Sequence, residues 1–470
     1  MATTMGGFPI PEATPALRRL RGQVQGRVLE PGRPGYDEAR GVWNRVIDRY
    51  PLLIVRAASI ADIPPVLEAA RETRLPLAVR GAGHSNAGLG TVDDGIVLDL
   101  GELREVSVDP ATRRVTAGPG ARAGDVDAAT APFRLAVPLG TVSLPGIAGM
   151  TLGGGVGWLV RSAGLALDRL VRVEVITADG QQLTASATEH PELFWGLRGG
   201  GGNFGVVTSF TFEAVPLPET VLGATLFYRP AQWRRALAAF ERWSRDLPDP
   251  LTSILTVMVM PAERGMGEEP WLLLRCVWVG EDEARGRELL ERLRATAPPD
   301  ESEIGPVSWP QWQSAADEFF PDQARGFWRN TAFSQMDEDA LDTITAVAAA
   351  LPGRGTSVDI HHLGGAFARV PAQATAFPNR TAQFWMTING YWQEPGEDAP
   401  FTAFAQRAEA AMTQLGEQGE YVNFRAREYT GPLSDLTRRI YGEQTYRRLQ
   451  QVKRRYDPGN LFRVNYNVTP

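Results

Sequence analysis

At 470 residues the chain is longer than one hydrophobic core usually supports, so two lobes or domains are expected. Hydrophobic residues make up 43% and charged residues 22%, a composition typical of globular proteins and not of disordered ones. The net charge of −7 argues against a nucleic-acid or anionic-membrane partner, and no apolar stretch approaches the ~18–20 residues of a membrane span.

Cysteine and histidine are too scarce for most metal sites. Cys276 is the one cysteine, which excludes a multi-thiolate zinc or iron–sulfur site, and we interpret it as a buried structural thiol. Only four histidines occur, so a multi-histidine site would need both His361 and His362. Consecutive strand residues face opposite sides, so at most one of the two faces a site, and no metal is expected. Segment 1–16 shows no secretory signal, which favours the cytoplasm.

The first 217 residues alternate short β-rich runs with helical patterns and many glycines. A helix is predicted over Ile60–Thr73, with Asp62 and Pro64 near its start. The pattern predicts strands at Leu52–Arg56, Leu77–Arg80, Ile96–Leu100, Val106–Val108, Arg114–Ala117, Val171–Thr177 and Val206–Phe212.

After residues 216–218 strands and helices come in runs, which favours an α+β lobe with a large sheet. Strands are predicted at Ile254–Met260, Trp271–Val279, Ser357–His362, Ala366–Val370 and Gln383–Tyr391. Helices are predicted at Gln232–Arg245, Glu281–Ala295, Asp337–Leu351, Phe401–Leu415 and Tyr441–Arg455. We expect a lobe of residues 219–415 inserted into one formed by residues 1–218 and completed by residues 416–470.

Three glycine-rich segments carry the chemistry. The first follows a predicted strand and reads RGAGHS from Arg80 to Ser85. Glycine permits close approach and positive φ, so such a loop offers several backbone N–H groups to one anion, of which a pyrophosphate is the obvious example. A tight turn without a ligand is the alternative.

The second segment runs from Gly140 to Gly157 and contains seven glycines among apolar residues such as Val142 and Leu144. This density suits backbone packed against a flat ring, since a flexible loop seldom carries so many apolar side chains. The third segment, residues 198–205, precedes a predicted strand. A nicotinamide-binding fingerprint is disfavoured there because no helix with a downstream acidic partner follows. Together the three segments indicate one long ligand with phosphates and a flat ring.

The motifs and their order resemble those of berberine-bridge-enzyme-like FAD oxidases, which belong to the vanillyl-alcohol-oxidase class. The resemblance covers essentially the whole chain and is carried by RGAGHSNAG, GTVSLPGIAGMTLGGGVGWLVRSAGLALD, ELFWGLRGGGGNFGVVTSF and YDPGNLFRVNYNVTP, with GYDEARGVWNRVIDRYP and GGAFARVPAQATAFPNRTAQFW. It implies an α+β, two-lobed fold of the PCMH type: an FAD-binding domain with an inserted α+β substrate domain that contains a large antiparallel sheet.

The resemblance also implies which residues hold the cofactor. His84 would be bonded to the 8α carbon of the flavin, and the surrounding loop with Gly88 would wrap the pyrophosphate. The implied FAD contacts are Arg80, Gly81, Ala82, Gly83, Ser85, Gly88, Thr141, Val142, Pro145, Gly146, Gly149, Met150, Gly153, Gly154, Gly157, Gly205, Val206, Asn465 and Asn467.

The chain departs from the family pattern at several positions. Val142 stands where many relatives carry a second flavin-linking cysteine, so a single covalent link is expected. Pro145 stands where relatives often have valine or leucine beside the flavin, which leaves the electron acceptor open. Phe424 replaces the tyrosine base of a YxNY-like strand, which is read here as residues 421–424. The remaining candidates for the proton acceptor or substrate pocket are Tyr421, Tyr391, Asn389, Glu428, His361 and His362.

The expected activity is hydride transfer from a hydroxylated or amine-bearing small molecule, such as a sugar, polyketide or other secondary metabolite, to FAD. O2 would reoxidise the flavin and give hydrogen peroxide. An oxygen-transferring tailoring enzyme that uses a flavin–oxygen adduct is the alternative, and a non-catalytic flavin-binding protein is a third. A monomer or a homodimer is expected.

Overall fold

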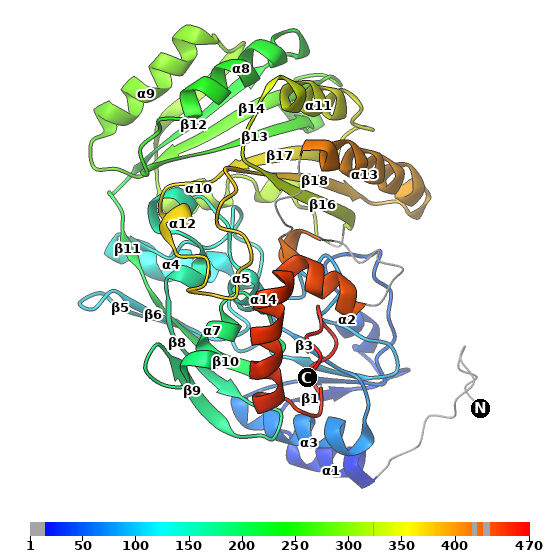
Figure 1. Ribbon diagram of the computed structural model, residues 1–470. Helices are drawn as coiled ribbons and strands as arrows, with labels where there is room; N and C mark the ends of the chain where they lie inside the picture. The colour runs from blue at the N-terminus through cyan, green and yellow to red at the C-terminus, as the bar shows by residue number, and fades with distance from the viewer. Residues whose placement is uncertain (1–14, 323, 416–420, 426–432) are drawn as a thin grey trace.

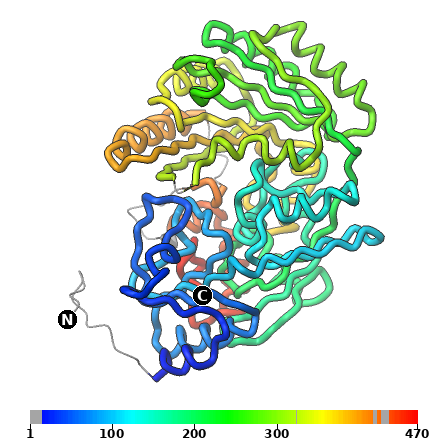
Figure 2. Tube along the Cα trace, turned by 180° about the vertical axis from the view of Figure 1, so that it is seen from behind, coloured from blue at the N-terminus to red at the C-terminus, as the bar shows by residue number. Residues whose placement is uncertain are grey.

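The chain folds into two lobes stacked on one another (Figure 1). The computed structural model describes residues 15–322, 324–415, 421–425 and 433–470. The upper lobe in this view is built around one seven-stranded sheet, and the described part of the lower lobe contains smaller sheets of four, five and two strands. Seen from behind, the blue N-terminal and red C-terminal parts of the chain lie in the same lower lobe (Figure 2). The middle of the chain therefore forms the upper lobe, as an insertion requires.

The first sheet of the lower lobe has the strand order β1-β2-β4-β3, with β2, β4 and β3 parallel. Its strands are β1 (Arg27–Leu29), β2 (Leu53–Arg56), β3 (Leu77–Arg80) and β4 (Ile96–Asp99). Helices α1 (Pro15–Gln23) and α3 (Ile63–Thr73) pack against it, and α2 (Tyr36–Arg40) follows β1. Both faces are covered, so β2 and β4 are almost continuously apolar, as is typical of parallel strands. Strand β3 ends where the first glycine-rich loop begins.

The second sheet of the lower lobe is antiparallel, in the order β5-β6-β10-β8-β9. Its strands are β5 (Val106–Asp109), β6 (Arg114–Ala117), β8 (Leu170–Ile176), β9 (Gln182–Ser186) and β10 (Val206–Glu213), and β7 (Leu135–Ala136) pairs with β11 (Val215–Pro216). The helices are α4 (Ala123–Thr130), α5 (Ile147–Gly153), α6 (Val160–Ala163), α7 (Pro191–Leu197) and the C-terminal α14 (Leu433–Tyr456), which is kinked at Gly442.

The upper lobe contains a seven-stranded antiparallel sheet in the order β15-β12-β14-β13-β17-β18-β16. Its strands are β12 (Val221–Tyr228), β13 (Leu251–Val259), β14 (Pro270–Trp278), β15 (Glu301–Val307), β16 (Arg325–Phe333), β17 (Thr356–His362) and β18 (Phe384–Trp392). Helices α8 (Trp233–Ser244), α9 (Glu283–Thr296), α11 (Glu338–Ala349) and α13 (Asp398–Met412) cover its outer face (Figure 1). The other face is turned toward the lower lobe.

Strand side chains alternate between these two faces. Leu255, Leu274 and Ile360 belong to the core beneath the helices, and so does Cys276, which is a buried free thiol as predicted. Their sequence neighbours point the other way. This alternation directs a second set of side chains toward the lower lobe. Some of them, such as Val277, pack against Trp158 and Trp312, and the others are available to a site between the lobes.

The structure corrects two local predictions. Residues 366–370 do not form a strand but the short helix α12 (Ala366–Arg369), because Gly364 and Gly365 adopt positive φ values of 91° and 55° and turn the chain out of the sheet. Residues 421–424 form a 3₁₀ turn, η9 (Val422–Phe424), in place of a strand.

The remaining predicted strands and helices lie within a few residues of observed ones. The strands that were not predicted are β1, β7, β9, β11, β12, β15 and β16. The segment 363–382 leaves the upper sheet, and its Phe367 and Phe377 pack into the core of the lower lobe. Because this segment of the predicted insertion belongs to the core of the lower lobe, the domain boundaries at 218/219 and 415/416 stay predictions. Within the described ranges, no helix combines the length and apolarity that crossing a bilayer requires.

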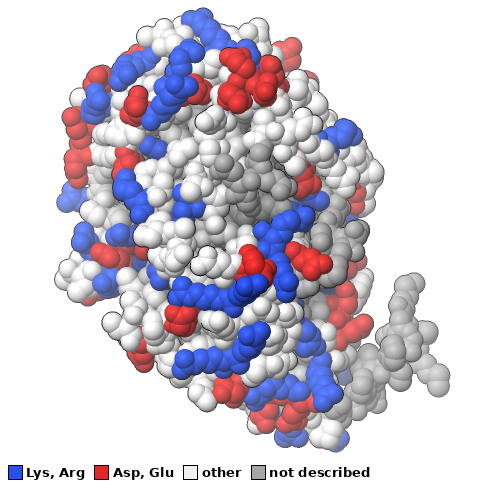
Figure 3. Space-filling model, viewed as in Figure 1, with Lys and Arg blue, Asp and Glu red and all other residues white. Residues whose placement is uncertain are grey.

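Both signs of charge are interspersed over the face of the molecule drawn in Figure 3. Many arginines of the chain are paired with carboxylates, for example Arg448 with Glu192 and Arg234 with Glu338. On the described part of this face, no single sign of charge dominates a large area.

Candidate active site

A cavity of about 930 Å³ lies between the upper sheet and the glycine-rich segments of the lower lobe. This volume is near the top of the ~300–1,000 Å³ range of small-molecule and cofactor sites. All three glycine-rich segments contribute to its wall, together with the inner face of the upper sheet, the turn η9 and the C-terminal tail. Segments separated by several hundred residues thus meet at one site.

The first glycine-rich loop presents backbone, not the Arg80 charge, to the cavity. The Arg80 guanidinium donates to Asp99 Oδ2 at 2.9 Å and to Ala39 O at 2.7 Å, so it anchors the loop from behind. A Cβ on Gly81 would lie 2.8 Å from Pro119 O, and Gly83 has a φ of 74°. Both positions therefore require glycine. The loop can approach a ligand closely because no side chain stands in the way.

His84 is on the cavity wall at the end of this loop. Its ring stacks on Trp43, with 5.7 Å between ring centroids and 19° between planes. Burial, with a smaller contribution from the Arg122 cation, lowers the pKa of His84 to about 4. The imidazole is therefore neutral at physiological pH and has a free lone pair, as a nucleophile or ligand needs.

The second glycine-rich segment packs directly on the first. A Cβ on Gly146 would lie 2.7 Å from Ala82 Cβ, whereas a Cβ on Gly149 would meet nothing within 4 Å. Gly146 therefore permits the two loops to touch, and Gly149 leaves open space at the cavity wall. Val142 and Pro145 also line the cavity.

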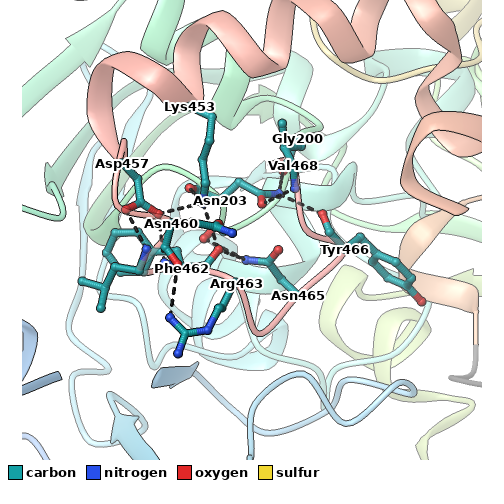
Figure 4. A network of polar contacts seen from close by, with 12 residues as sticks. Gly200, Asn203, Lys453, Asp457, Asn460, Phe462, Arg463, Asn465, Tyr466 and Val468 are labelled. Carbon is teal, nitrogen blue, oxygen red and sulfur yellow. Dashed lines mark hydrogen bonds and ion pairs between the residues drawn. The ribbon is translucent and has the colours of Figure 1, made fainter. Parts of the chain in front are cut away.

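The third glycine-rich segment is joined to the C-terminal tail by Asn203 (Figure 4). Asn203 Nδ2 donates to Gly200 O at 2.8 Å and to Tyr466 O at 3.1 Å, and its Oδ1 accepts from Val468 N at 2.9 Å. The amide is thus fully used in holding two parts of the chain together. This pairing brings Asn465 to the cavity wall.

A buried lysine completes that junction (Figure 4). Lys453, the single lysine of the chain, donates to Asp457 Oδ2 at 2.7 Å, Asn203 O at 2.9 Å and Phe462 O at 3.1 Å. Burial lowers the pKa of Lys453, and the Asp457 carboxylate opposes this shift. All three ammonium protons are used, so the ion pair is satisfied inside the protein.

The inner face of the upper sheet supplies the polar side of the cavity. Alternate residues of β17 and β18 point inward, in agreement with the two-residue period of strands. The inward polar residues of these two strands are Ser357, Asp359, His361, Thr387, Asn389 and Tyr391.

Asp359 was not among the residues selected from the sequence. Its carboxylate accepts hydrogen bonds from Ser357 Oγ at 3.1 Å and from Asn389 Nδ2. Burial raises the pKa of Asp359 to about 6. The alternation of Ser357, Asp359 and His361 along one strand was the available signal, because three polar residues at i, i+2 and i+4 mark a polar face.

The two adjacent histidines face opposite sides of the sheet, as predicted. His361 lines the cavity beside Phe424, and burial lowers its pKa to about 4. His362 lies on the helix-covered side, where it contacts Arg161 and Ser253. Among the described residues, no group of three or more histidine, cysteine or acidic side chains could hold a metal ion.

Neither of the two candidate tyrosines in the cavity wall is suited to accept a proton. Tyr421 Oη accepts from Gly155 N and from Asn423 Nδ2, both at 2.8 Å, and burial raises its pKa to about 12. It therefore holds the second glycine-rich segment and is a poor proton acceptor. Burial also raises the pKa of Tyr391 well above its usual value. Glu428, the remaining acidic candidate, lies outside the described residues.

Most of the expected cofactor contacts line the cavity, but four do not: Gly88, Gly154, Gly157 and Asn467. A Cβ on Gly154 would touch Phe377 and Tyr421, and one on Gly157 would lie 2.0 Å from Leu139 O. These glycines permit close packing within the protein and do not form the cavity wall.

Comparison with known proteins agrees with this geometry. The FAD binding domain family matches residues 51–186, and the family described as berberine and berberine like matches residues 420–469. The FAD-linked oxidoreductase YgaK of Bacillus subtilis is 31% identical, with 95% of this chain and 98% of the relative covered. The chain belongs to the berberine-like FAD-linked oxidoreductases.

Two further similar proteins are oxidases by name. The (R)-6-hydroxynicotine oxidase of Paenarthrobacter nicotinovorans is 30% identical, with 95% of this chain and 97% of the relative covered. The crystal structure of 6-hydroxy-D-nicotine oxidase from Arthrobacter nicotinovorans has a TM-score of 0.83 at 26% identity, covering 95% of this chain and 98% of that one. The α+β, two-lobed PCMH-type fold inferred from the motifs is confirmed, and the protein is an FAD-linked enzyme.

The cavity of this berberine-like oxidoreductase fits FAD. Glycines that face open space at Gly149, Gly201 and Gly202 leave room for a flat ring and phosphates. Among the described residues, none donates a hydrogen bond to the buried Asn465 Oδ1 at the cavity wall, so this oxygen is available to accept one from a bound group. At Val142 the chain offers no nucleophile, whereas His84 does.

Proposed function

We propose that this protein is an FAD-dependent oxidase that removes a hydride from a hydroxylated or amine-bearing small molecule. The observation that carries this proposal is that the three glycine-rich segments and a polar sheet face with Asp359 at its centre line the same cavity. When bound, FAD supplies the hydride acceptor, and O2 restores its oxidised form with release of hydrogen peroxide. The protein supplies binding, orientation and a proton acceptor.

Asp359 is the proposed proton acceptor. Hydride loss from an alcohol or ammonium carbon requires that the hydroxyl or ammonium proton leave as well. Asp359 is a carboxylate at neutral pH, since its raised pKa of about 6 is still below 7. Hydrogen bonds from Ser357 and Asn389 orient it. The neutral imidazole of His361 lies beside it on the same strand face and can orient the reacting group.

His84 is the proposed covalent attachment point for the flavin. Its neutral ring, packed on Trp43, suits a nucleophile for the 8α carbon. A single link is expected because Val142 provides no thiol. Covalent attachment would prevent the cofactor from dissociating.

The substrate class follows from the chemistry of the wall. Hydroxyl, amide, imidazole and carboxylate groups on β17 and β18 suit a polar substrate with an exchangeable proton. The name of the 6-hydroxynicotine oxidase relative supports an amine-bearing substrate as one possibility. A cytoplasmic location and a monomeric or homodimeric state stay predictions.

Anaerobic mixing of the purified, flavin-loaded protein with panels of alcohols, sugars and amines tests this function. A productive substrate should bleach the visible flavin absorption, and admission of O2 should restore it with one hydrogen peroxide per turnover. Label transferred from isotopic O2 into the product would indicate oxygen transfer in place of the oxidase reaction. Failure of every panel member to reduce the flavin would count against an oxidase of this substrate class.

A further inference from the structure

Among the described residues of the cavity wall, one guanidinium makes no hydrogen bond or ion pair with another side chain. Arg275 is on β14, two residues from Leu273, and both side chains line the cavity. Within the described part of the chain, the Arg275 guanidinium has no hydrogen-bond or ion-pair partner. Its five N–H donors are therefore available to a ligand.

Two tryptophans hold this guanidinium in place. It lies over the rings of Trp158 and Trp312, at 4.9 and 5.1 Å from their centroids, and the two rings are themselves 5.1 Å apart. Burial lowers the pKa of Arg275 to about 10, so the side chain remains cationic at neutral pH. Stacking on indoles keeps the planar fork oriented but uses none of its donors.

The neighbouring charges are already engaged. Arg354, also on the wall, pairs with Glu268, and the wall residue Glu318 pairs with Arg264 at 3.0 Å. Asp359 is close enough to influence the pKa of Arg275, but its carboxylate is hydrogen-bonded by other side chains. Asp359 therefore supplies nearby negative charge but takes no hydrogen bond from the Arg275 guanidinium. The unused donors at the cavity wall indicate that Arg275 can bind an anionic group of a ligand.

We propose that Arg275 binds a carboxylate group of the substrate. The proposal rests on the oxidase function above and narrows its substrate class to carboxylated alcohols or amines. A guanidinium fork matches the two oxygens of a carboxylate. A phosphate dianion is less suitable, because Arg275 is the one unpaired cation of the described wall and Asp359 adds negative charge nearby.

The sheet register sets the separation between the two ends of such a substrate. Ile254 on β13 pairs with Arg275 on one side and with His361 on the other. Arg275 and His361 are thus two strands apart, about 10 Å at the backbone given ~4.8 Å per strand. The carboxylate and the oxidised carbon are therefore separated by a spacer of several bonds, about the size of an aromatic ring, which excludes a simple 2-hydroxy acid.

Calorimetric titration of the flavin-loaded protein tests the proposal. The probes are 4-(hydroxymethyl)benzoate, its neutral isostere 4-(hydroxymethyl)benzamide, and 4-(hydroxymethyl)phenyl phosphate. Wild-type protein should bind the benzoate roughly 10- to 100-fold more tightly than the amide, the range for a charge-assisted bidentate contact. The phosphate should bind more weakly than the benzoate.

Three variants locate the effect. Arg275→Gln should abolish the preference for the carboxylate, and Arg275→Lys should retain part of it, because the charge remains but the planar fork is lost. Arg245→Gln removes an exposed cation that, like its partner Glu241, does not line the cavity, and it should keep the full preference. Circular dichroism and flavin content verify folding, and Arg275→Lys carries the comparison if Arg275→Gln does not fold.

An equal affinity of wild type for benzoate and benzamide, or a preference that survives Arg275→Gln, would overturn the proposal. Binding does not require flavin reduction, so the two proposals fail separately. A protein that oxidises neutral alcohols without any carboxylate preference keeps the oxidase function and loses this inference. Carboxylate binding through Arg275 without flavin reduction by any substrate does the reverse.

Discussion

At the scale of single residues, the site depends on how burial changes protonation. His84 and His361 are kept neutral, because burial disfavours the imidazolium form, whereas burial moves Asp359 toward its protonated form. The same desolvation therefore makes two histidines available as uncharged groups and makes a carboxylate a stronger base. Perturbed groups of this kind, gathered in one cavity, are typical of active sites.

The pH dependence of turnover should report Asp359. Because the carboxylate form is the proposed proton acceptor, kcat/KM should rise as the pH increases through about 6 and then level off. In Asp359→Asn this limb should disappear, and the rate of flavin reduction should fall by about 10²- to 10⁴-fold. Stopped-flow reduction over a pH series measures both. An unchanged pH profile in the variant would assign the base elsewhere.

His84→Ala should leave the flavin bound without a covalent link. After acid precipitation the wild-type pellet should stay yellow, whereas the variant should release its flavin to the supernatant. His190→Ala is the matched control, since His190 lies outside the cavity wall, and its pellet should keep the colour. Release of flavin from the wild-type protein would show that the proposed attachment is wrong.

At the scale of elements, the cavity wall is formed by glycine-rich loops that pack on one another and by strands whose side chains alternate between the two faces of the sheet. The turn η9 illustrates how a distant strand sets a local structure: Asn330 of β16 accepts from Tyr421 N at 2.8 Å and donates to Phe424 O at 3.1 Å. These bonds close residues 421–424 into a turn where the sequence pattern had favoured a strand. The polar wall likewise depends on β17 and β18 being neighbours.

Contact between the first two glycine-rich segments should be sensitive to a single methyl group. Gly146→Ala would place a Cβ 2.7 Å from Ala82 Cβ, so the loops must separate and flavin content should fall severalfold. Gly22→Ala on α1 is the control, because a Cβ there meets nothing within 4 Å. The ratio of flavin to protein absorbance gives the answer, and equal flavin loading in both variants would contradict the expectation.

At the scale of the whole molecule, the two lobes and the tail are joined by buried polar contacts around the cavity. Lys453 and Asp457 connect α14, the tail and the third glycine-rich segment, and Arg380 pairs with Asp168 to join the upper-lobe excursion to the lower lobe. Such ion pairs fix the relative positions of the segments that they join, because removal of one partner leaves an uncompensated charge in the protein interior.

Lys453→Met should therefore destabilise the protein by about 3–5 kcal/mol, since it leaves Asp457 charged and buried. Arg447→Met, which breaks the exposed ion pair with Glu443, should change stability by less than about 1 kcal/mol. Urea unfolding followed by fluorescence compares the two. Similar midpoints for both variants would show that the buried pair contributes little.

The sequence by itself determined the cofactor side of this protein. The glycine-rich segments and the fold class could be predicted because close backbone approach requires glycine within short, continuous stretches, and such local requirements leave local motifs. A single covalent link at His84, with Val142 in place of a second nucleophile, is implied by the family resemblance and stays a prediction.

Only the tertiary structure decided the substrate side. Asp359 and Arg275 lie in strands where alternating polar residues are common, so the sequence pattern does not single them out. Tyr421 was a candidate base from the sequence, but in the structure its hydroxyl accepts hydrogen bonds from Gly155 N and Asn423 Nδ2. Which of these side chains share a wall depends on the strand order β14-β13-β17-β18. Within that order, β13 pairs with β17 although their paired residues are about 100 positions apart in the chain, and no short stretch of sequence encodes this pairing.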